Sequence, residues 1–188
     1  MTGCYIRRIR RRALYRISDA AAGCKYVCLL PVLPVAAGNI ILGFAEGRAC
    51  AFSWLPPAAA VCEELFFRGL ILKSLLLPRM RPAAAIAVSA ALFGAAHILN
   101  LLSGSLFVSM FFQMLYAFCF SVWAGAVVYR QSSILIPLCV HVLINLTSTS
   151  AEILWLDLSA AALFLISGVF IASGPAQSEA QCASVPDA

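Results

Sequence analysis

The chain has 188 residues, of which 63% are hydrophobic and 11% charged, with a formal net charge of +5. Soluble domains carry roughly a quarter charged residues, so this composition excludes an ordinary soluble domain and indicates a membrane protein. Six of the 13 basic residues fall between Arg7 and Arg16, ahead of the first apolar run. Such a block is typical of a membrane orientation signal, so we expect the lipid bilayer as a partner and no nucleic acid.

The composition divides the chain into a basic surface segment at 1–19, one membrane-embedded domain at 20–172, and a small polar, disordered tail at 173–188. None of the eight cysteines forms a CxxC pair, and most lie in apolar runs, where a thiol behaves as a small hydrophobe. A disulfide framework is therefore not expected.

The apolar runs predict an all-α fold, a polytopic transmembrane helical bundle of about six spans. A run of about 20 residues reaches across the roughly 30 Å of a bilayer core, and prolines, Ser103-Gly104-Ser105 and short polar stretches separate the runs. The predicted spans are roughly 26–45, 57–77, 82–101, 106–129, 133–147 and 152–172. By alternation, Arg79, Arg81 and Arg130 fall on the side of the basic N-terminus, which predicts that the N-terminus is cytoplasmic.

The second predicted span carries Glu63, Glu64 and Arg68 inside an otherwise apolar run. A charged side chain deep in a bilayer costs roughly 2.5 to 3.5 kcal/mol on insertion scales, so three of them together need a reason. Glu64 and Arg68 are four residues apart and share a helical face, where they can neutralise each other. Glu63 lies about 100° round the helix and has no local partner.

The polar groups of the neighbouring spans lie at a similar depth. Glu63 and His97 are each 15 residues from the basic turn at 78–82, which places both about 22 Å from that side of the membrane. His141 and Asn145 share a face of the fifth span at a comparable level. Four polar groups from three helices therefore converge on one layer, and converging intramembrane ionisable groups indicate a functional site.

A carboxylate and an imidazole around one water can activate that water for attack on a carbonyl group. A second imidazole and a carboxamide can stabilise the oxyanion that develops. Phe93 shares a face with His97 and would form an aromatic wall beside it, while the small Gly94, Ala95 and Ala96 would let a neighbouring helix approach closely. Glu63, His97 and His141 would also provide a zinc site with an open position, so zinc is an alternative cofactor.

Three ordered motifs resemble the CAAX protease and bacteriocin-processing (CPBP) family, the type II CAAX prenyl endopeptidases and their bacterial relatives, also labelled abortive infection proteins. The family patterns EExxxR, FxxxH and HxxxN stand here as Glu63-Glu64-x-x-x-Arg68, Phe93-x-x-x-His97 and His141-x-x-x-Asn145. The ordered triple inside apolar spans is specific, although about six spans are fewer than the eight common in the family.

The resemblance implies an intramembrane endopeptidase in which Glu63 and His97 activate a water while His141 and Asn145 form the oxyanion site. The family is often labelled metalloprotease, and a glutamate-dependent mechanism without obligatory metal is also proposed for it. The resemblance further implies a multi-pass protein of a bacterial cell membrane. Its substrate would be a peptide or membrane protein, such as a leader peptide, pheromone or bacteriocin, and not a prenylated CAAX protein.

Two other functions remain open from the sequence. A non-proteolytic scaffold or bacteriocin-immunity protein of the same fold would use the polar groups to hold the bundle together. A proton or ion transporter would use the Glu-His cluster as a relay, but the repeats and broken helices typical of such transporters are not evident.

Overall fold

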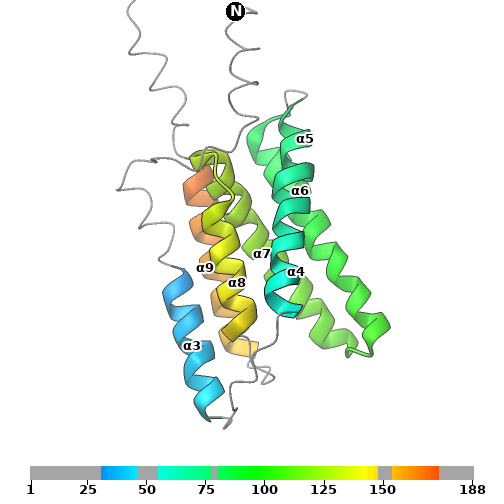
Figure 1. The fold of residues 1–188 in the computed structure, drawn as a ribbon, viewed down its shortest axis with the longest axis vertical. Helices are drawn as coiled ribbons and strands as arrows, with labels where there is room; N and C mark the ends of the chain where they lie inside the picture. The colour runs from blue at the N-terminus through cyan, green and yellow to red at the C-terminus, as the bar shows by residue number, and fades with distance from the viewer. Residues whose placement is uncertain (1–30, 46–54, 78–79, 148–153, 174–188) are drawn as a thin grey trace, which may run out of the picture.

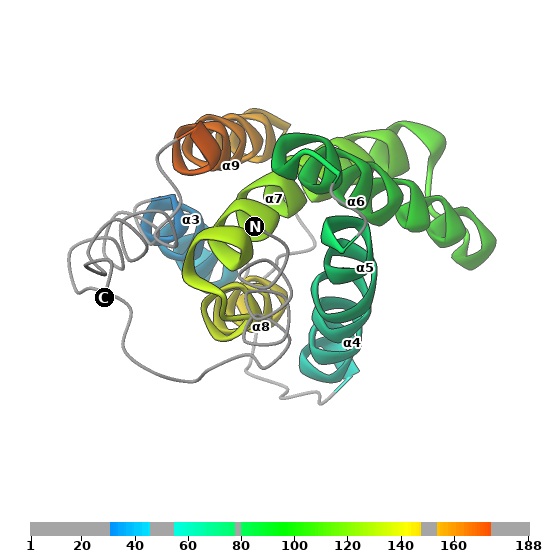
Figure 2. The same cartoon turned by 90° about the horizontal axis from the view of Figure 1, so that it is seen from above.

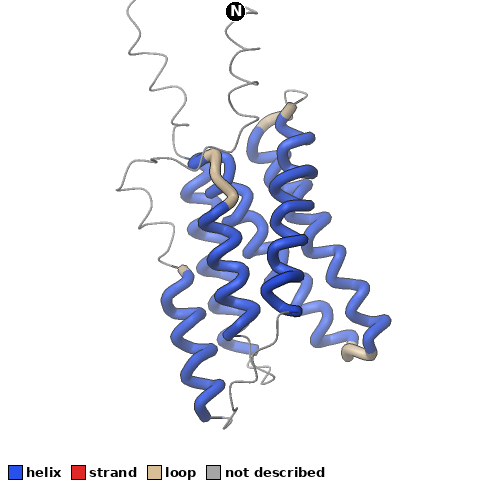
Figure 3. The backbone as a smooth tube through the Cα atoms, viewed as in Figure 1, coloured by secondary structure: helices blue, strands red, loops and turns tan. Residues whose placement is uncertain are grey.

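The computed structural model describes residues 31–45, 55–77, 80–147 and 154–173, and all the regular structure within them is helical (Figure 3). The predicted surface segment 1–19 and the tail from residue 174 onward lie outside these described residues. The elements are α3 (Val32–Ala45), α4 (Leu55–Glu64), the π-helix η1 (Leu65–Leu72), α5 (Lys73–Leu76), α6 (Pro82–Ala96), the 3₁₀-helix η2 (His97–Ser103), α7 (Phe107–Gln131), α8 (Leu135–Thr147) and α9 (Leu154–Ser173) (Figure 1).

Helix boundaries follow the helix breakers of the sequence. α3 begins at Val32, between two prolines, and α6 begins at Pro82, where the missing N–H of proline costs no helical hydrogen bond. Gly104 has φ of 85° and ends η2, because glycine adopts this left-handed conformation without steric strain. The predicted break at Ser103-Gly104-Ser105 is therefore confirmed.

The described helices form six rods, one within each predicted span. Continuous helical backbone joins α4, η1 and α5 into one rod and joins α6 to η2 in another, while α3, α7, α8 and α9 are single helices. The boundaries agree with the predicted spans to within a few residues, except that residues 26–30 of the first predicted span lie outside the described chain. The all-α helical bundle is thus confirmed.

Three of the described helices are long and apolar enough to cross a membrane, namely Pro82–Leu102, Phe107–Gln131 and Trp155–Ser173. α3 has 14 residues and α8 has 13, or about 20 Å at 1.5 Å per residue, which is shorter than a bilayer core of about 30 Å. The α4–η1–α5 rod is long enough, but its glutamates, arginine and lysine lower its apolarity.

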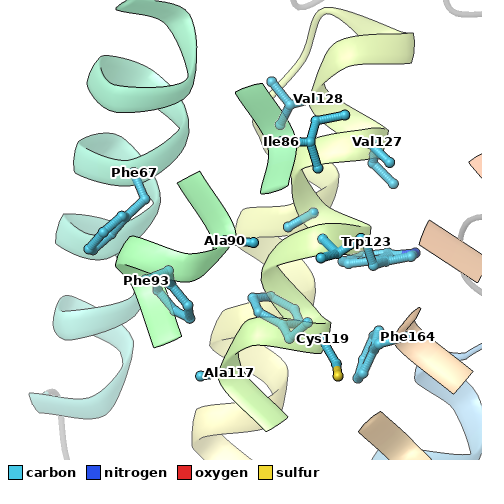
Figure 4. Packing of buried hydrophobic residues seen from close by; sticks show 14 of the residues in the cluster. Phe67, Ile86, Ala90, Phe93, Ala117, Cys119, Trp123, Val127, Val128 and Phe164 are labelled. Carbon is cyan, nitrogen blue, oxygen red and sulfur yellow. The ribbon is translucent and has the colours of Figure 1, made fainter. Parts of the chain in front are cut away.

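α7 lies in the middle of the bundle, as the view from above shows (Figure 2). It packs against α9 on one side and α6 on the other, while α4 packs against α8. Trp123 of α7 and Phe164 of α9 are fully buried, and their ring centroids are 5.3 Å apart (Figure 4). The apolar core therefore lies along α7, and the polar residues lie on α8 and on the two rods α4–η1–α5 and α6–η2.

Two glycines allow neighbouring helices to approach α7 closely. A Cβ atom at Gly168 of α9 would lie 2.8 Å from the Cα atom of Trp123, and one at Gly94 of α6 would lie 3.0 Å from the carbonyl oxygen of Met114. Since any larger residue would push the helices apart, these positions fix the distance between α7 and its two neighbours. The close approach predicted at Gly94 is confirmed.

Candidate active site

The two adjacent glutamates lie at the point where helix geometry changes. Glu63 and Glu64 end α4, and the π-helix η1 begins at the next residue, Leu65. Isolated π-helical turns are rare and often occur at functional sites. The buried hydroxyl of Ser89 on α6 donates a hydrogen bond of 3.2 Å to the carbonyl oxygen of Phe67, which ties the π-helix to the neighbouring rod.

Glu64 and Arg68 form the predicted ion pair. Arg68 Nη1 lies 2.8 Å from Glu64 Oε1, and both side chains are fully buried. The guanidinium carbon of Arg68 also lies 4.5 Å from the ring centroid of Phe93 and 5.5 Å from that of Phe120. Because a buried charge needs both a counter-ion and a favourable contact surface, the carboxylate and the two aromatic faces together account for an arginine at this depth.

His141 of α8 lies between the two glutamates. Its Nδ1 is 2.9 Å from Glu64 Oε1, a hydrogen bond, and its Nε2 is 3.6 Å from Glu63 Oε2. Since a carboxylate only accepts, the Nδ1–H of His141 donates to Glu64. Glu64 is therefore shared by Arg68 and His141, whereas the sequence analysis assigned it only to Arg68.

His97 lies at the junction of α6 and η2. Its Nδ1 is 3.0 Å from the backbone oxygen of Phe93, and because a carbonyl only accepts, Nδ1 carries the proton. The neutral ring then has its lone pair on Nε2, so Nε2 is the basic nitrogen. The predicted proximity of Phe93 is also present, with the two ring centroids 5.1 Å apart. Within the described chain, no ion pair joins His97 to Glu63.

Asn145 lies one turn beyond His141 on α8. Its Nδ2 donates a hydrogen bond of 3.1 Å to the backbone oxygen of Pro56, in the first turn of α4. This bond and the Glu64–His141 bond both cross from α8 to α4, so they fix the position of α8 along the glutamate-bearing helix.

A pocket of about 370 Å³ opens between these elements. All four predicted catalytic residues line it, together with the predicted aromatic residue Phe93, while Glu64 and Arg68 are not among the lining residues. The lining residues are Glu63, Phe67, Phe93, Ala96, His97, Leu99, Asn100, Gln113, His141 and Asn145.

The sequence analysis missed two polar lining residues. Asn100 Nδ2 donates a hydrogen bond of 2.8 Å to Gln113 Oε1, which joins η2 to α7 at the pocket. In this stretch the sequence analysis identified only the nearby break at Ser103-Gly104-Ser105. Gln113 could have been identified from the sequence. It is a carboxamide within an uncharged apolar span, and polar side chains in such spans tend to face the interior of the bundle.

The alternative zinc site requires Glu63, His97 and His141 to point at one centre. Among the described residues, no group of three His, Cys, Asp or Glu side chains is arranged to hold a metal ion. His141 and His97 each use Nδ1 in a hydrogen bond to a carboxylate or a carbonyl of the protein, as metal-binding histidines commonly do, so these bonds by themselves do not oppose metal binding through Nε2.

Comparison with known proteins gives one match. No curated protein and no solved structure matches the chain. The family model described as type II CAAX prenyl endopeptidase Rce1-like matches residues 47–147, more than half of the chain. This range includes the glutamate pair, both histidines and Asn145. The chain therefore belongs to the type II CAAX prenyl endopeptidase Rce1-like family, a family of intramembrane proteases of the CAAX type.

Proposed function

We propose that this protein is an intramembrane endopeptidase that hydrolyses a peptide bond with a water activated by Glu63 and His97. The observation that carries the proposal is that Glu63, His97, His141 and Asn145, four polar groups from three rods, line one and the same pocket. Its volume of about 370 Å³ accommodates a short stretch of extended peptide and one water.

The first step is activation of the water. Glu63 is partly exposed to the pocket. It accepts a proton from the water while the water oxygen attacks the peptide carbonyl. His97, whose Nδ1–H is held by the Phe93 carbonyl, accepts a hydrogen bond from the same water through Nε2 and so orients it. The protein thus supplies one base and one orienting group.

The second step is stabilisation of the tetrahedral oxyanion. In its doubly protonated form, the ring of His141 donates Nδ1–H to Glu64 and presents Nε2–H toward the pocket, and Asn145 contributes its carboxamide. Glu64, itself neutralised by Arg68, holds the His141 ring in a fixed orientation. When the intermediate collapses, the C–N bond breaks and Glu63 returns its proton to the leaving amine.

A non-proteolytic scaffold is the second candidate, and one observation favours it. The Glu64–His141 and Asn145–Pro56 hydrogen bonds both join α8 to α4, which is what a polar network with a purely structural role would do. Glu63 and His97 distinguish the two functions, because both line the pocket and neither makes a hydrogen bond that joins α8 to α4 in the described structure. The contact of Glu63 Oε2 with His141 Nε2 is longer, at 3.6 Å. A bacteriocin-immunity protein would belong to this second class.

A library of quenched peptides, presented to the purified protein in detergent, tests the proposal. We expect cleavage by the wild-type protein, with similar rates in a chelator and after zinc loading. Cleavage only after zinc loading would replace the metal-free mechanism with a metal-dependent one. No cleavage in either condition would favour the scaffold.

We also propose that the protein is multi-pass with a cytoplasmic N-terminus, in a bacterial cell membrane, and that its substrate is a leader peptide, pheromone or similar membrane-associated peptide. The basic turns at 78–82 and 130–132 then share the side of the N-terminus, because positively charged loops remain inside. Reporter fusions at Arg81 and Ser103 should give opposite signals. Equal signals would contradict this topology.

A further inference from the structure

The pocket has a buried end and an exposed end. Phe93 and His141 are 2% and 7% exposed, whereas Leu99 is 61% exposed and Gln113 is also exposed. Of the groups assigned to catalysis, His141 lies at the buried end, whereas Glu63, His97 and Asn145 are partly exposed. Asn100 is also partly exposed, and its hydrogen-bonded partner Gln113 is exposed; we call these two side chains the amide pair. The amide pair therefore lines the same pocket as the catalytic groups, with Gln113 at its exposed side.

The amide pair keeps unused hydrogen-bonding capacity. The bond from Asn100 Nδ2 to Gln113 Oε1 leaves Asn100 Oδ1 as an acceptor and Gln113 Nε2 as a donor, with no other protein partner among the described residues. Exchanging the nitrogen and oxygen atoms of both side chains gives the same result, one acceptor and one donor. A peptide backbone presents one N–H and one C=O per residue, which complement the free acceptor and the free donor of the amide pair. A charged side chain of a substrate would complement this pair less well.

The 3₁₀ geometry of η2 sets the distance between the amide pair and the catalytic groups. His97 and Asn100 are three residues apart in η2, and in a 3₁₀-helix side chains three residues apart eclipse each other, at a rise of about 2.0 Å per residue. The two side chains are thus separated by about 6 Å along the axis, on one side of the helix. An extended peptide advances about 3.3 to 3.6 Å per residue, so this separation corresponds to about two substrate residues.

From these observations we infer that the amide pair of Asn100 and Gln113 binds the substrate backbone about two residues from the cleaved bond. Asn100 accepts a hydrogen bond from a backbone N–H, and Gln113 donates one to a backbone C=O. Both are positioning residues that hold an extended peptide by its main chain, so this subsite tolerates varied side chains. The inference rests on the proposed peptidase function.

Peptide binding tests the inference separately from cleavage. The probe is a fluorescent decapeptide selected from a library for retention by the full-length Glu63→Gln protein in detergent, which is expected to bind substrate without cleaving it. In the Glu63→Gln background, a second substitution, Asn100→Ala or Gln113→Ala, should weaken binding of the peptide about 5- to 10-fold, which is the effect of one lost hydrogen bond. Adding Ser105→Ala, in the same turn but outside the pocket lining, should have no effect.

An ester scan of the same peptide distinguishes direct contact from a structural role. Replacing one backbone N–H at a time by an ester oxygen should weaken binding about 5- to 10-fold at one position. In the Asn100→Ala variant, the ester and the amide peptide should bind equally well at that position, because the Asn100 Oδ1 acceptor is missing. In cleavage by the wild-type protein, the sensitive position should lie about two residues from the cut, and the Asn100→Ala substitution made in the wild-type background should raise KM more than it lowers kcat.

The other outcomes overturn the inference or the proposed function in distinguishable ways. Equal ester sensitivity with and without Asn100→Ala would show that the amide pair only joins η2 to α7. Failure of Glu63→Gln to retain any peptide would also overturn the inference. Retention with the expected ester pattern, but without cleavage by the wild-type protein, would support the backbone subsite and contradict the peptidase.

Discussion

The α7–α9 pair and the two rods built from α4–η1–α5 and α6–η2 differ in how closely they keep α-helical geometry. α7 and α9 are regular over 25 and 20 residues and pack through apolar side chains. The other two rods leave α-helical geometry once each, directly after Glu64 and at His97.

This difference separates packing from chemistry. Apolar contact between helices is non-directional, so a regular helix with suitable residue sizes satisfies it. A polar site instead requires particular atoms to point in particular directions, and a wider or tighter helical turn changes the direction of every following side chain. The rods that carry Glu63 and His97 therefore depart from regular geometry at the site, whereas the apolar pair does not.

The largest expected effect concerns the two adjacent glutamates. Glu63→Gln removes only the base, so the peptidase rate should fall about 1000- to 10,000-fold while thermal stability in detergent stays unchanged. Glu64→Gln weakens the buried contacts to Arg68 and His141, so it should lower thermal stability first. A full rate for Glu63→Gln beside a stable but inactive Glu64→Gln would reverse the two roles.

The oxyanion groups on α8 should affect turnover more than binding. His141→Ala and Asn145→Ala should each lower kcat about 100- to 1000-fold with a smaller change in KM, since their contacts strengthen in the transition state. His141→Ala should also reduce stability, because Glu64 loses a buried partner. Steady-state kinetics of the folded fraction measure both effects, and Cys139→Ala, exposed on the same helix, is the control. An increase in KM alone would assign these residues to substrate binding.

The buried ion pair should dominate stability in the polar rods. Arg68→Ala leaves Glu64 as an uncompensated buried charge and should cost about 3 to 5 kcal/mol. Arg68→Lys should restore only part of this, because an ammonium group lacks the planar surface that lies over Phe93. Thermal unfolding in detergent measures both, and Arg81→Ala at the exposed turn should leave the midpoint unchanged. Equal stability of Arg68→Lys and wild type would mean that charge alone suffices.

The smallest expected effect lies in the apolar pair. Gly168→Ala places a Cβ atom 2.8 Å from the Trp123 backbone, so it should cost about 1 to 3 kcal/mol by separating α9 from α7. The peptidase rate of the folded fraction should not change, because neither Gly168 nor Trp123 lines the pocket. Gly69→Ala, where a Cβ atom meets nothing within 4 Å, is the matched control and should not destabilise the protein. Loss of rate in Gly168→Ala without loss of stability would show that the two regions are coupled.

The sequence by itself determined the six helical rods and predicted four of the polar residues that line the pocket. Apolar runs, prolines and the break at Gly104 act over a few residues, so helix positions can be predicted without knowing the packing. The same local reasoning predicted the Glu64–Arg68 pair, because both partners belong to one helix and spacing alone brings them together. The ordered motifs also indicated the family before any fold was known.

Only the tertiary structure decided which polar groups meet. The contact of His141 with both glutamates depends on the position of α8 along α4, and residue spacing within one helix does not specify that position. The sequence also did not predict the π-helical turn after Glu64 or the 3₁₀ turn at His97. These turns differ from an α-helix in their backbone hydrogen bonds, and such short segments show no distinct spacing of apolar residues in the sequence. The amide pair appears only once η2 folds back against α7, because its two members interact across the turn between separate helices.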